Sequence, residues 1–292
     1  MSVETGAVRV YVGATEEHRV PARVLESSIR RATAARVEIR ILGVGDQDLV
    51  PAALRARGYT SFTFQRFAIP ALQGFAGRAL YLDSDMLVFR DIRALWERPF
   101  DGAQVLCVPR PSGIGSSAQF SVLVLDCGAL AWDVVEIAAR LEQGALTYRA
   151  LVQDLAVADR IAPVLPPEWN SMEAFDARRT ALLHFTRVET QPWLSAQNPL
   201  GALWVEALFD ALDDGAVPLD LVAAQVRSGL LRPSLLWQVE RREADARRIP
   251  PAVRRRLDGG FRIPGRTRGS ALTRLATLAH GAWSRWTTVG RA

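Results

Sequence analysis

Two aspartates interrupt an otherwise apolar stretch at residues 78–89, which reads RALYLDSDMLVF. Asp83 and Asp85 lie two positions apart, so in an extended segment both side chains project from the same face. Burying two like charges beside a core strand is costly unless a positive group neutralises them. Oxygen ligands of this kind favour a hard divalent cation such as Mg²⁺ or Mn²⁺, which commonly also binds phosphate oxygens. The pair therefore indicates a metal site for a phosphate-bearing ligand.

An isolated pair of this kind more often only shapes the turn after a strand, because so short a motif recurs by chance. Here the apolar residues on both sides favour the metal interpretation, since solvent alone cannot easily satisfy carboxylates in such surroundings. Ser84, between the two aspartates, would face the other way and could hydrogen-bond a ribose or another hydroxyl.

The segments around the pair predict strands that alternate with helices. Strands are predicted at 8–13, 37–44, 77–85, 103–110 and 119–127. Helices are predicted at 22–32, 49–58, 61–72 with an interruption at Pro70, and 129–144, and a short helix or a turn at 92–100. This alternation implies an α/β sandwich with mainly parallel strands, in which ligands bind beyond the carboxyl ends of the strands. After about residue 205 the pattern is helical, without a convincing strand.

The chain of 292 residues, 49% of them hydrophobic, can bury one large core, alone or with a smaller appendage. No long uncharged apolar run predicts a transmembrane span, and the first residues do not resemble a secretory signal. Cys107 and Cys127 are too few for a disulfide framework, which indicates two buried thiols in a reducing cytosol. A cytoplasmic location is therefore expected.

The net charge of +5 is divided unevenly along the chain. From Val226 onward, 15 arginines stand against four acidic residues, a net charge of +11, whereas residues 1–225 carry −6. Residues 241–270 are rich in Arg, Pro and Gly and are expected to be linker-like, and 271–286 predicts a terminal amphipathic helix. A solvated tail is the favoured interpretation, followed by peripheral contact with anionic lipid at the inner face of a membrane. Nucleic-acid binding is not expected, because no recognition motif accompanies the charge.

The order of motifs resembles that of the glycosyltransferases of family eight, retaining enzymes with a GT-A fold. The resemblance centres on YLDSDMLVF (81–89), with FQRFAIP (64–70) before it and IRALWERPFDGA (92–103) after it. Further similar segments are VRVYVGAT (8–15), LPPEWNSM (165–172) and LLHFTRVETQPW (182–193). The resemblance implies a Rossmann-like nucleotide-diphospho-sugar transferase domain over residues 1–210, with a mixed, mainly parallel sheet flanked by helices. A helical, Arg-rich extension would then occupy residues 211–292.

The resemblance also implies a ligand set for the cation, which would be Mn²⁺ or Mg²⁺. Asp83, Asp85 and His184 match the metal ligands of the family, and a neutral imidazole beside two carboxylates suits Mn²⁺. Taken without the resemblance, His184 would more often be a hydrogen-bonded core histidine. The two other histidines, His18 and His280, lie in no comparable setting.

Other positions match residues that contact the nucleotide-sugar. Arg66 corresponds to an arginine that reaches the donor sugar or its phosphates, although a surface arginine is about equally favoured. The end of the first predicted strand would contact the nucleotide base. The donor-binding residues implied are Val12, Gly13, Ala14, Ser84, Trp169, Asn170 and Gln191. Trp169 could equally belong to the core.

The sequence departs from the family pattern at several positions. Val152 stands where the family has the first aspartate of its DQD segment, whereas Gln153 and Asp154 are kept. Gln191 replaces a lysine that helps to neutralise the diphosphate, so Arg187 could supply the missing charge. A further asparagine is replaced by serine at position 121. These departures suggest a divergent bacterial branch of the family.

The reaction implied is transfer of a sugar from a nucleotide-diphosphate donor, expected to be a UDP-sugar, to a hydroxyl acceptor with retention. Gln153 is expected to support the positive face of the reacting sugar, and Asp154 to do the same or to bind the acceptor. Two alternatives stay open: a catalytically impaired protein that binds sugar nucleotides or carbohydrates, and a nucleotidyltransferase. Hydrolysis of the donor to UDP favours the transferase, and release of pyrophosphate from a nucleoside triphosphate favours the nucleotidyltransferase.

Overall fold

The computed structural model describes residues 6–45, 61–110 and 118–264. The helices predicted at 49–58 and 271–286 lie outside the described residues. The chain divides into two compact units. The first comprises Met1–Ser171 and Asp176–Leu183, and the second comprises Met172–Phe175 and His184–Ala292.

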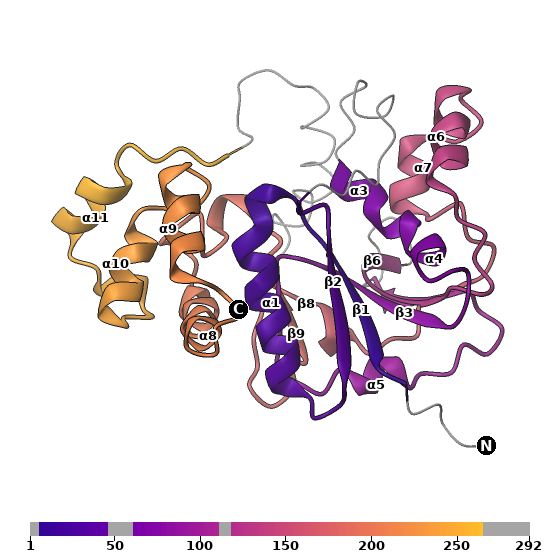
Figure 1. Ribbon diagram of the computed structural model, residues 1–292, viewed down its shortest axis with the longest axis horizontal. Helices are drawn as coiled ribbons and strands as arrows, with labels where there is room; N and C mark the ends of the chain where they lie inside the picture. The colour runs from indigo at the N-terminus through magenta and orange to yellow at the C-terminus, as the bar shows by residue number, and fades with distance from the viewer. Residues whose placement is uncertain (1–5, 46–60, 111–117, 265–292) are drawn as a thin grey trace, which may run out of the picture. The chain divides into compact units, whose positions relative to one another are not determined.

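The first unit is built on a six-stranded sheet (Figure 1). In spatial order its strands are β2 (Val37–Leu42), β1 (Val8–Gly13), β3 (Arg78–Asp83), β6 (Ala118–Asp126), β5 (Val105–Pro109) and β7 (Ile161–Ala162). β1 runs parallel to β2 and β3, and β7 runs parallel to β5, whereas β6 is antiparallel to both of its neighbours. The predicted α/β class with a mixed, mainly parallel sheet is therefore confirmed.

The helices of the first unit follow the predicted segments with shifted boundaries, except for α7, which was not predicted. They are α1 (Arg19–Ala32), α3 (Ser61–Gln65), α4 (Ile69–Leu72), α5 (Arg93–Trp96), α6 (Val134–Glu142) and α7 (Tyr148–Gln153). Short 3-10 turns occupy η1 (Glu16–His18), η2 (Arg66–Ala68) and η3 (Pro167–Asn170). Pro70 lies in the first turn of α4, where no helical N–H is required, and so does not interrupt that helix. The predicted start of α6 at residue 129 is wrong, because the Asp133 carboxylate caps the helix by accepting two backbone N–H bonds.

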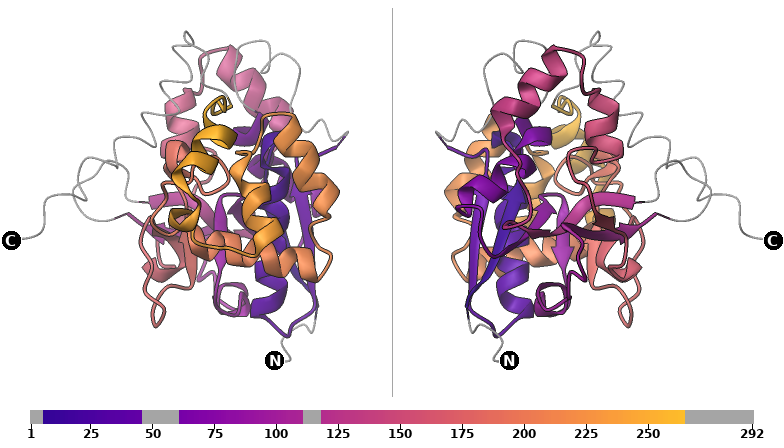
Figure 2. Two further views of the ribbon diagram at one scale, coloured as in Figure 1. Left: turned by 90° about the vertical axis from the view of Figure 1, so that its left-hand side faces the viewer. Right: turned by 90° about the vertical axis from the view of Figure 1, so that its right-hand side faces the viewer.

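Strand β3 shows how this sheet buries both of its faces. Ala79 and Tyr81 point into a core that also contains Phe64 of α3 and apolar residues of α6 and α7. Leu80 and Leu82 point into the opposite core, which α1 covers. Figure 2 shows these strands, coloured indigo to magenta, from two further directions. A strand buried on both faces reads as a continuous apolar run, which is why a charged residue at its end stands out.

A second, three-stranded sheet has the order β4 (Met86–Val88), β9 (Leu182–His184) and β8 (Ser171–Met172). Only two residues separate β3 from β4, so Ser84 and Asp85 form the turn between the two strands. The boundary between the two units falls within β9, between Leu183 and His184. His184 is thus the last residue of a strand that begins in the first unit.

The second unit is helical, as the sequence predicts. It contains η4 (Val188–Thr190), α8 (Gly201–Asp213), α9 (Leu219–Arg227), α10 (Ser234–Arg241), η5 (Ala246–Arg248) and α11 (Pro251–Asp258). In its core the rings of Trp193 and Trp204 lie 5.2 Å apart. The Arg232 guanidinium is also buried, donates to the Pro192 carbonyl over 2.8 Å, and has its pKa lowered to about 10 by burial, which Asp258 partly opposes. None of the described helices is both long and apolar enough to cross a bilayer.

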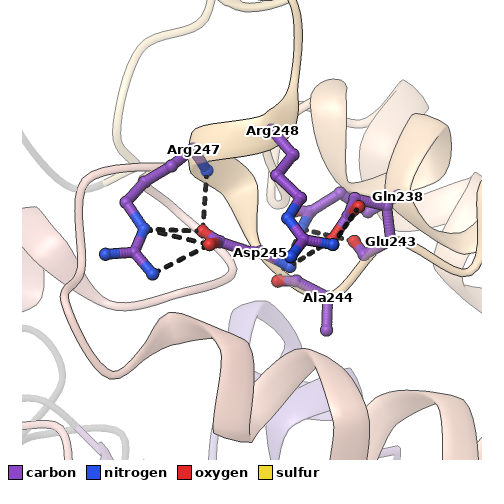
Figure 3. Close-up of polar contacts among 6 residues, drawn as sticks. All are labelled: Gln238, Glu243, Ala244, Asp245, Arg247 and Arg248. Carbon is purple, nitrogen blue, oxygen red and sulfur yellow. Dashed lines mark hydrogen bonds and ion pairs between the residues drawn. The ribbon is translucent and has the colours of Figure 1, made fainter.

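The expectation of a linker-like segment from residue 241 is wrong as far as residue 264, because hydrogen bonds order the turn between α10 and α11. Figure 3 shows the side chain of Gln238, which donates to the carbonyls of Glu243 and Ala244 over 2.9 Å each. The Asp245 carboxylate accepts the backbone N–H of Arg247 and pairs with its guanidinium at 2.8 Å. Arginine-rich composition alone does not reveal which side chains will hydrogen-bond to backbone carbonyl and N–H groups. These hydrogen bonds give the segment a defined structure.

The two cysteines are buried and free, as predicted. Burial raises the pKa of Cys107 to about 12 and the pKa of Cys127 to about 12. Both groups are therefore neutral thiols at neutral pH and act as small apolar side chains.

Candidate metal and donor site

The first aspartate of the pair ends strand β3 and is held by a tyrosine of the same strand. Asp83 is 4% exposed and lies opposite Gly13 in the parallel pairing of β1 with β3. The Tyr81 hydroxyl donates to Asp83 Oδ1 over 2.7 Å, as two residues on one face of a strand can. Burial raises the pKa of Tyr81 well above its ordinary value, and Asp83 adds to this although Arg66 opposes it. The phenol therefore stays protonated and remains a donor.

Arg66 is the positive group that accompanies Asp83. Its Nη2 lies 3.5 Å from Asp83 Oδ1, and its guanidinium carbon lies 4.7 Å from the centroid of the Tyr81 ring. Its Nη1 donates to the carbonyl of Phe120 over 2.6 Å. Burial acts to lower the pKa of Arg66, but Tyr81 and Asp83 outweigh it and raise that pKa. The alternative of a surface arginine is therefore wrong, because Arg66 is buried beside the aspartate.

The three predicted metal ligands come together. Asp83, Asp85 and His184 each offer one ligand atom, and these atoms all lie within 4.8 Å of one another. Opposite ligands of an octahedral cation stand about 4.2 Å apart, so a small adjustment would close the cluster on Mg²⁺ or Mn²⁺. The described contacts of Asp83 with Tyr81 and Arg66 both use Oδ1, which leaves Oδ2 for a ligand. Two carboxylates and an imidazole therefore fit a divalent cation.

The predicted base-contacting segment at the end of β1 is tightly packed. Val12 and Ala14 are fully buried, so their side chains offer no exposed surface to a ligand. A Cβ atom on Gly13 would collide with the Tyr81 hydroxyl, which explains why glycine stands beside the tyrosine that holds Asp83. Contacts of this segment with a nucleotide stay a prediction.

Gln65 was missed by the sequence reasoning, although it clamps the end of β1. Its Oε1 accepts the Ala14 N–H over 3.0 Å, and its Nε2 donates to the Ala14 carbonyl over 2.6 Å. Gly43, at φ +70°, leaves room for this amide, because a Cβ atom there would overlap Gln65 Nε2. A glutamine in an apolar helical segment was the signal, since a buried amide must find partners.

The remaining donor-contacting residues are buried, and their binding roles stay predictions. Trp169 packs in the core that α1 covers, so its surroundings are those of a core residue. The Asn170 side chain donates to Gln119 Oε1. Gln191 is 2% exposed and donates to the carbonyl of Phe185 over 3.0 Å. Ser84 is 2% exposed.

Gln153 and Asp154 lie at the end of α7. The Gln153 side chain accepts from Arg149 Nε over 3.1 Å, one turn earlier in the helix. Asp154 is exposed. Burial of Arg110 lowers the pKa of that arginine, and the charge of Asp154 acts in the opposite direction. Within the part of the chain that the structure describes, neither side chain contacts the aspartate pair, so their catalytic roles stay predictions.

His18 is a second residue that the sequence reasoning missed. Burial lowers the pKa of His18, whereas Asp85, Glu17 and Asp83 act in the opposite direction. His18 is not among the three candidate metal ligands, but two of their carboxylates, Asp85 and Asp83, act on it electrostatically. The available signal was its place in the turn after β1, since neighbouring parallel strands end at one edge of the sheet.

Comparison with known proteins agrees with this arrangement. Residues 23–124 match the sequence model of Glycosyl transferase family 8. Protein CDI of Arabidopsis thaliana is 30% identical over 110 residues, which are 37% of this chain and 42% of that protein. The chain thus spans less than half the length of this curated relative.

Solved glycosyltransferases share the fold at low sequence identity. The glycosyltransferase GlyE of Streptococcus pneumoniae TIGR4 is similar with a TM-score of 0.54 and 17% identity, over 78% of this chain and 65% of that one. The galactosyltransferase LgtC, in complex with donor and acceptor sugar analogues, gives 0.53 and 14% identity, over 69% and 95% of the two chains. The bifunctional glycosyltransferase WbbM gives 0.53 and 16% identity, over 71% of this chain and 50% of that one. The match over residues 23–124 and the shared GT-A fold agree with the predicted resemblance to family-8 glycosyltransferases.

Proposed function

We propose that this chain transfers a sugar from a nucleotide-diphosphate donor, with a UDP-sugar as the expected donor, to a hydroxyl acceptor with retention of configuration. One observation carries the proposal: two carboxylates and an imidazole converge beyond the carboxyl end of β3. In α/β sheets this edge is where ligands bind. The family match and the fold support the same reaction class.

In this proposal Asp83, Asp85 and His184 hold Mn²⁺ or Mg²⁺. The bound cation would stabilise the negative charge that grows on the leaving diphosphate. Tyr81 and Arg66 act on Asp83 from the side of Oδ1 and keep the carboxylate oriented. A carboxylate fixed in this way is ready to bind, so less side-chain entropy is lost when the donor arrives.

The sugar itself would be met by residues outside this cluster. As the glycosidic bond breaks, the sugar develops oxocarbenium character, which a polar oxygen on the facing side stabilises. We assign this role to Gln153, and assign to Asp154 either the same role or contact with the acceptor hydroxyl. Gln191 is neutral where the family has a lysine, so we assign the compensating positive charge to Arg187.

Binding and turnover test the proposal separately. Thermal unfolding of the full chain with UDP-sugars, with and without Mn²⁺, should show stabilisation only when both are present, because a ligand of the folded state adds to stability by mass action. Release of UDP should accompany it. Asp85→Asn and His184→Asn should abolish both effects, whereas the control Asp101→Asn, at an exposed turn, should keep them. Donor-dependent stabilisation that survives in both site variants would contradict the assignment.

A second partner is proposed for helix α11. This helix contains Arg254, Arg255 and Arg256, and the last two are exposed. Clustered arginines attract anionic lipid by about 1 kcal/mol each near the surface. We propose peripheral contact of the cytoplasmic protein with an anionic bilayer. Co-sedimentation with phosphatidylglycerol vesicles should weaken when all three arginines are changed to glutamine, while Arg36→Gln should leave it unchanged; equal losses in both variants would reject the contact.

A further inference from the structure

The turn after β1 contains a hydrogen-bonded group that the proposed roles do not use. The Thr15 hydroxyl donates to Glu17 Oε2 over 2.5 Å, and its oxygen lies 2.9 Å from His18 Nδ1. The His18 ring also lies against the ring of Phe62, with 6.4 Å between the centroids. These contacts hold the imidazole in one orientation.

Counting protons assigns the tautomer of His18. A threonine hydroxyl carries a single proton, and Thr15 donates that proton to Glu17 Oε2. The Thr15 oxygen must therefore accept from His18, which places the imidazole proton on Nδ1. In a neutral ring Nε2 then carries a lone pair and can only accept. Within residues 6–45, 61–110 and 118–264, Nε2 has no hydrogen-bond partner.

His18 follows β1 at the edge of the sheet that carries the aspartates. The parallel pairing of Gly13 with Asp83 brings the turns after β1 and β3 side by side. His18 interacts electrostatically with Asp85 and Asp83, and its pKa is nonetheless lowered by burial, so the ring is neutral at pH 7. His18 is not among the three residues whose ligand atoms lie within 4.8 Å of one another, so the proposed cation does not require it as a ligand.

We propose that His18 determines recognition of the nucleotide, its Nε2 accepting a hydrogen bond from a ribose hydroxyl of the donor. The inference rests on the proposed function and deepens it. An acceptor at the carboxyl edge of an α/β sheet is the usual partner of a ribose hydroxyl, and a carboxylate commonly fills that role. A neutral imidazole serves here without adding a third negative charge beside Asp83 and Asp85, where the diphosphate must also bind.

Binding of UDP in the presence of Mn²⁺, measured by calorimetry on the full chain, tests the role of His18. His18→Phe keeps a ring against Phe62 but removes both nitrogens, and should raise the Kd for UDP about tenfold, the upper range for one neutral hydrogen bond. Thr15→Val removes the acceptor that holds the Nδ1 proton and should raise the Kd about threefold, whereas Thr15→Ser should bind as the wild type does. The kcat with a UDP-sugar should change little in all three variants, because the contact is made equally in ground and transition states.

Deoxynucleotides locate the contact. The wild type should bind either 2′-deoxy-UDP or 3′-deoxy-UDP about tenfold more weakly than UDP, and His18→Phe should bind that analogue and UDP equally well. Equal losses in the wild type and in His18→Phe would overturn the inference, as would a Kd for UDP that His18→Phe does not change. Absence of UDP binding by the wild type would overturn the proposed function and this inference with it.

The tautomer can be observed without any ligand. Nitrogen-15 NMR of the imidazole rings, with the His18 signals assigned by their loss in His18→Phe, should show a protonated Nδ1 and a bare Nε2. Thr15→Val should shift the proton toward Nε2. A wild-type ring protonated at Nε2 would overturn the inference.

Discussion

Replacing Arg66 with methionine removes the positive group from a buried cluster and leaves the rest of the cluster in place. Methionine fills much of the same volume, so the main change is electrostatic. Asp83 would keep the Tyr81 hydroxyl as a partner but would lose the guanidinium 3.5 Å away. The carbonyl of Phe120 would also lose a donor. The variant therefore tests whether Arg66 neutralises the aspartate at the end of β3.

The expected loss follows from the burial of both partners, whose side chains are 11% and 6% exposed. Removing one partner of a buried ion pair lowers the free energy of unfolding by about 3–5 kcal/mol, because an uncompensated charge stays buried. The distance of 3.5 Å is longer than that of a strong charged hydrogen bond, and Tyr81 remains. We therefore expect the lower end of this range, about 3 kcal/mol.

Urea unfolding at pH 7 in EDTA, followed by circular dichroism, measures this loss. The control is Arg36→Met, because Arg36 is 82% exposed and forms a 3.0 Å surface pair with Glu38. Such pairs contribute at most about 1 kcal/mol. Asp83→Asn combined with Arg66→Met should lose about 2 kcal/mol less than the sum of the single losses, since the two groups interact directly. Additive losses, or a loss in Arg66→Met no larger than in the control, would refute the reasoning.

Three further predictions concern buried groups of the first unit. Gly13→Ala should lower the free energy of unfolding by about 1–3 kcal/mol, because the new methyl group meets the Tyr81 hydroxyl; Gly128→Ala, where a Cβ atom meets its neighbours only at 3.5 Å, should lose clearly less in the same urea titration. Gln65→Leu should lower it by about 2–4 kcal/mol, since both the buried N–H and the carbonyl of Ala14 lose their partner, and an unchanged thermal midpoint would contradict the clamp. The buried cysteines have pKa values raised to about 12, so the unfolded chain releases their protons first, and stability should fall as the pH rises from about 9 toward 12. Replacing both cysteines with alanine should flatten that slope in urea titrations at pH 8 and pH 10, and a slope unchanged by the replacement would exclude this origin.

The strands and the aspartate pair could be predicted because their signals are local. Strand β3 is buried on both faces, so it reads as a continuous apolar run, and a charge at its end is visible without any knowledge of its neighbours. The predicted strand at 8–13 agrees with β1 for the same reason. Residues 241–264 were mistaken for a linker, because composition does not show which backbone groups a side chain such as that of Gln238 will satisfy.

By itself, the sequence determined where the apolar strands lie, that an acidic pair ends one of them, and which distant histidine resembles a third ligand. Only the tertiary structure decided that β6 runs antiparallel to its neighbours, that Arg66 is buried against Asp83, and that Gln65 clamps the end of β1. It also decided the tautomer of His18, through a threonine whose only proton is given to a glutamate. The reason is physical. Apolar periodicity is a local property of the sequence, whereas the hydrogen-bond partner of a buried polar group depends on which segments pack together. One sequence pattern is compatible with many such packing arrangements.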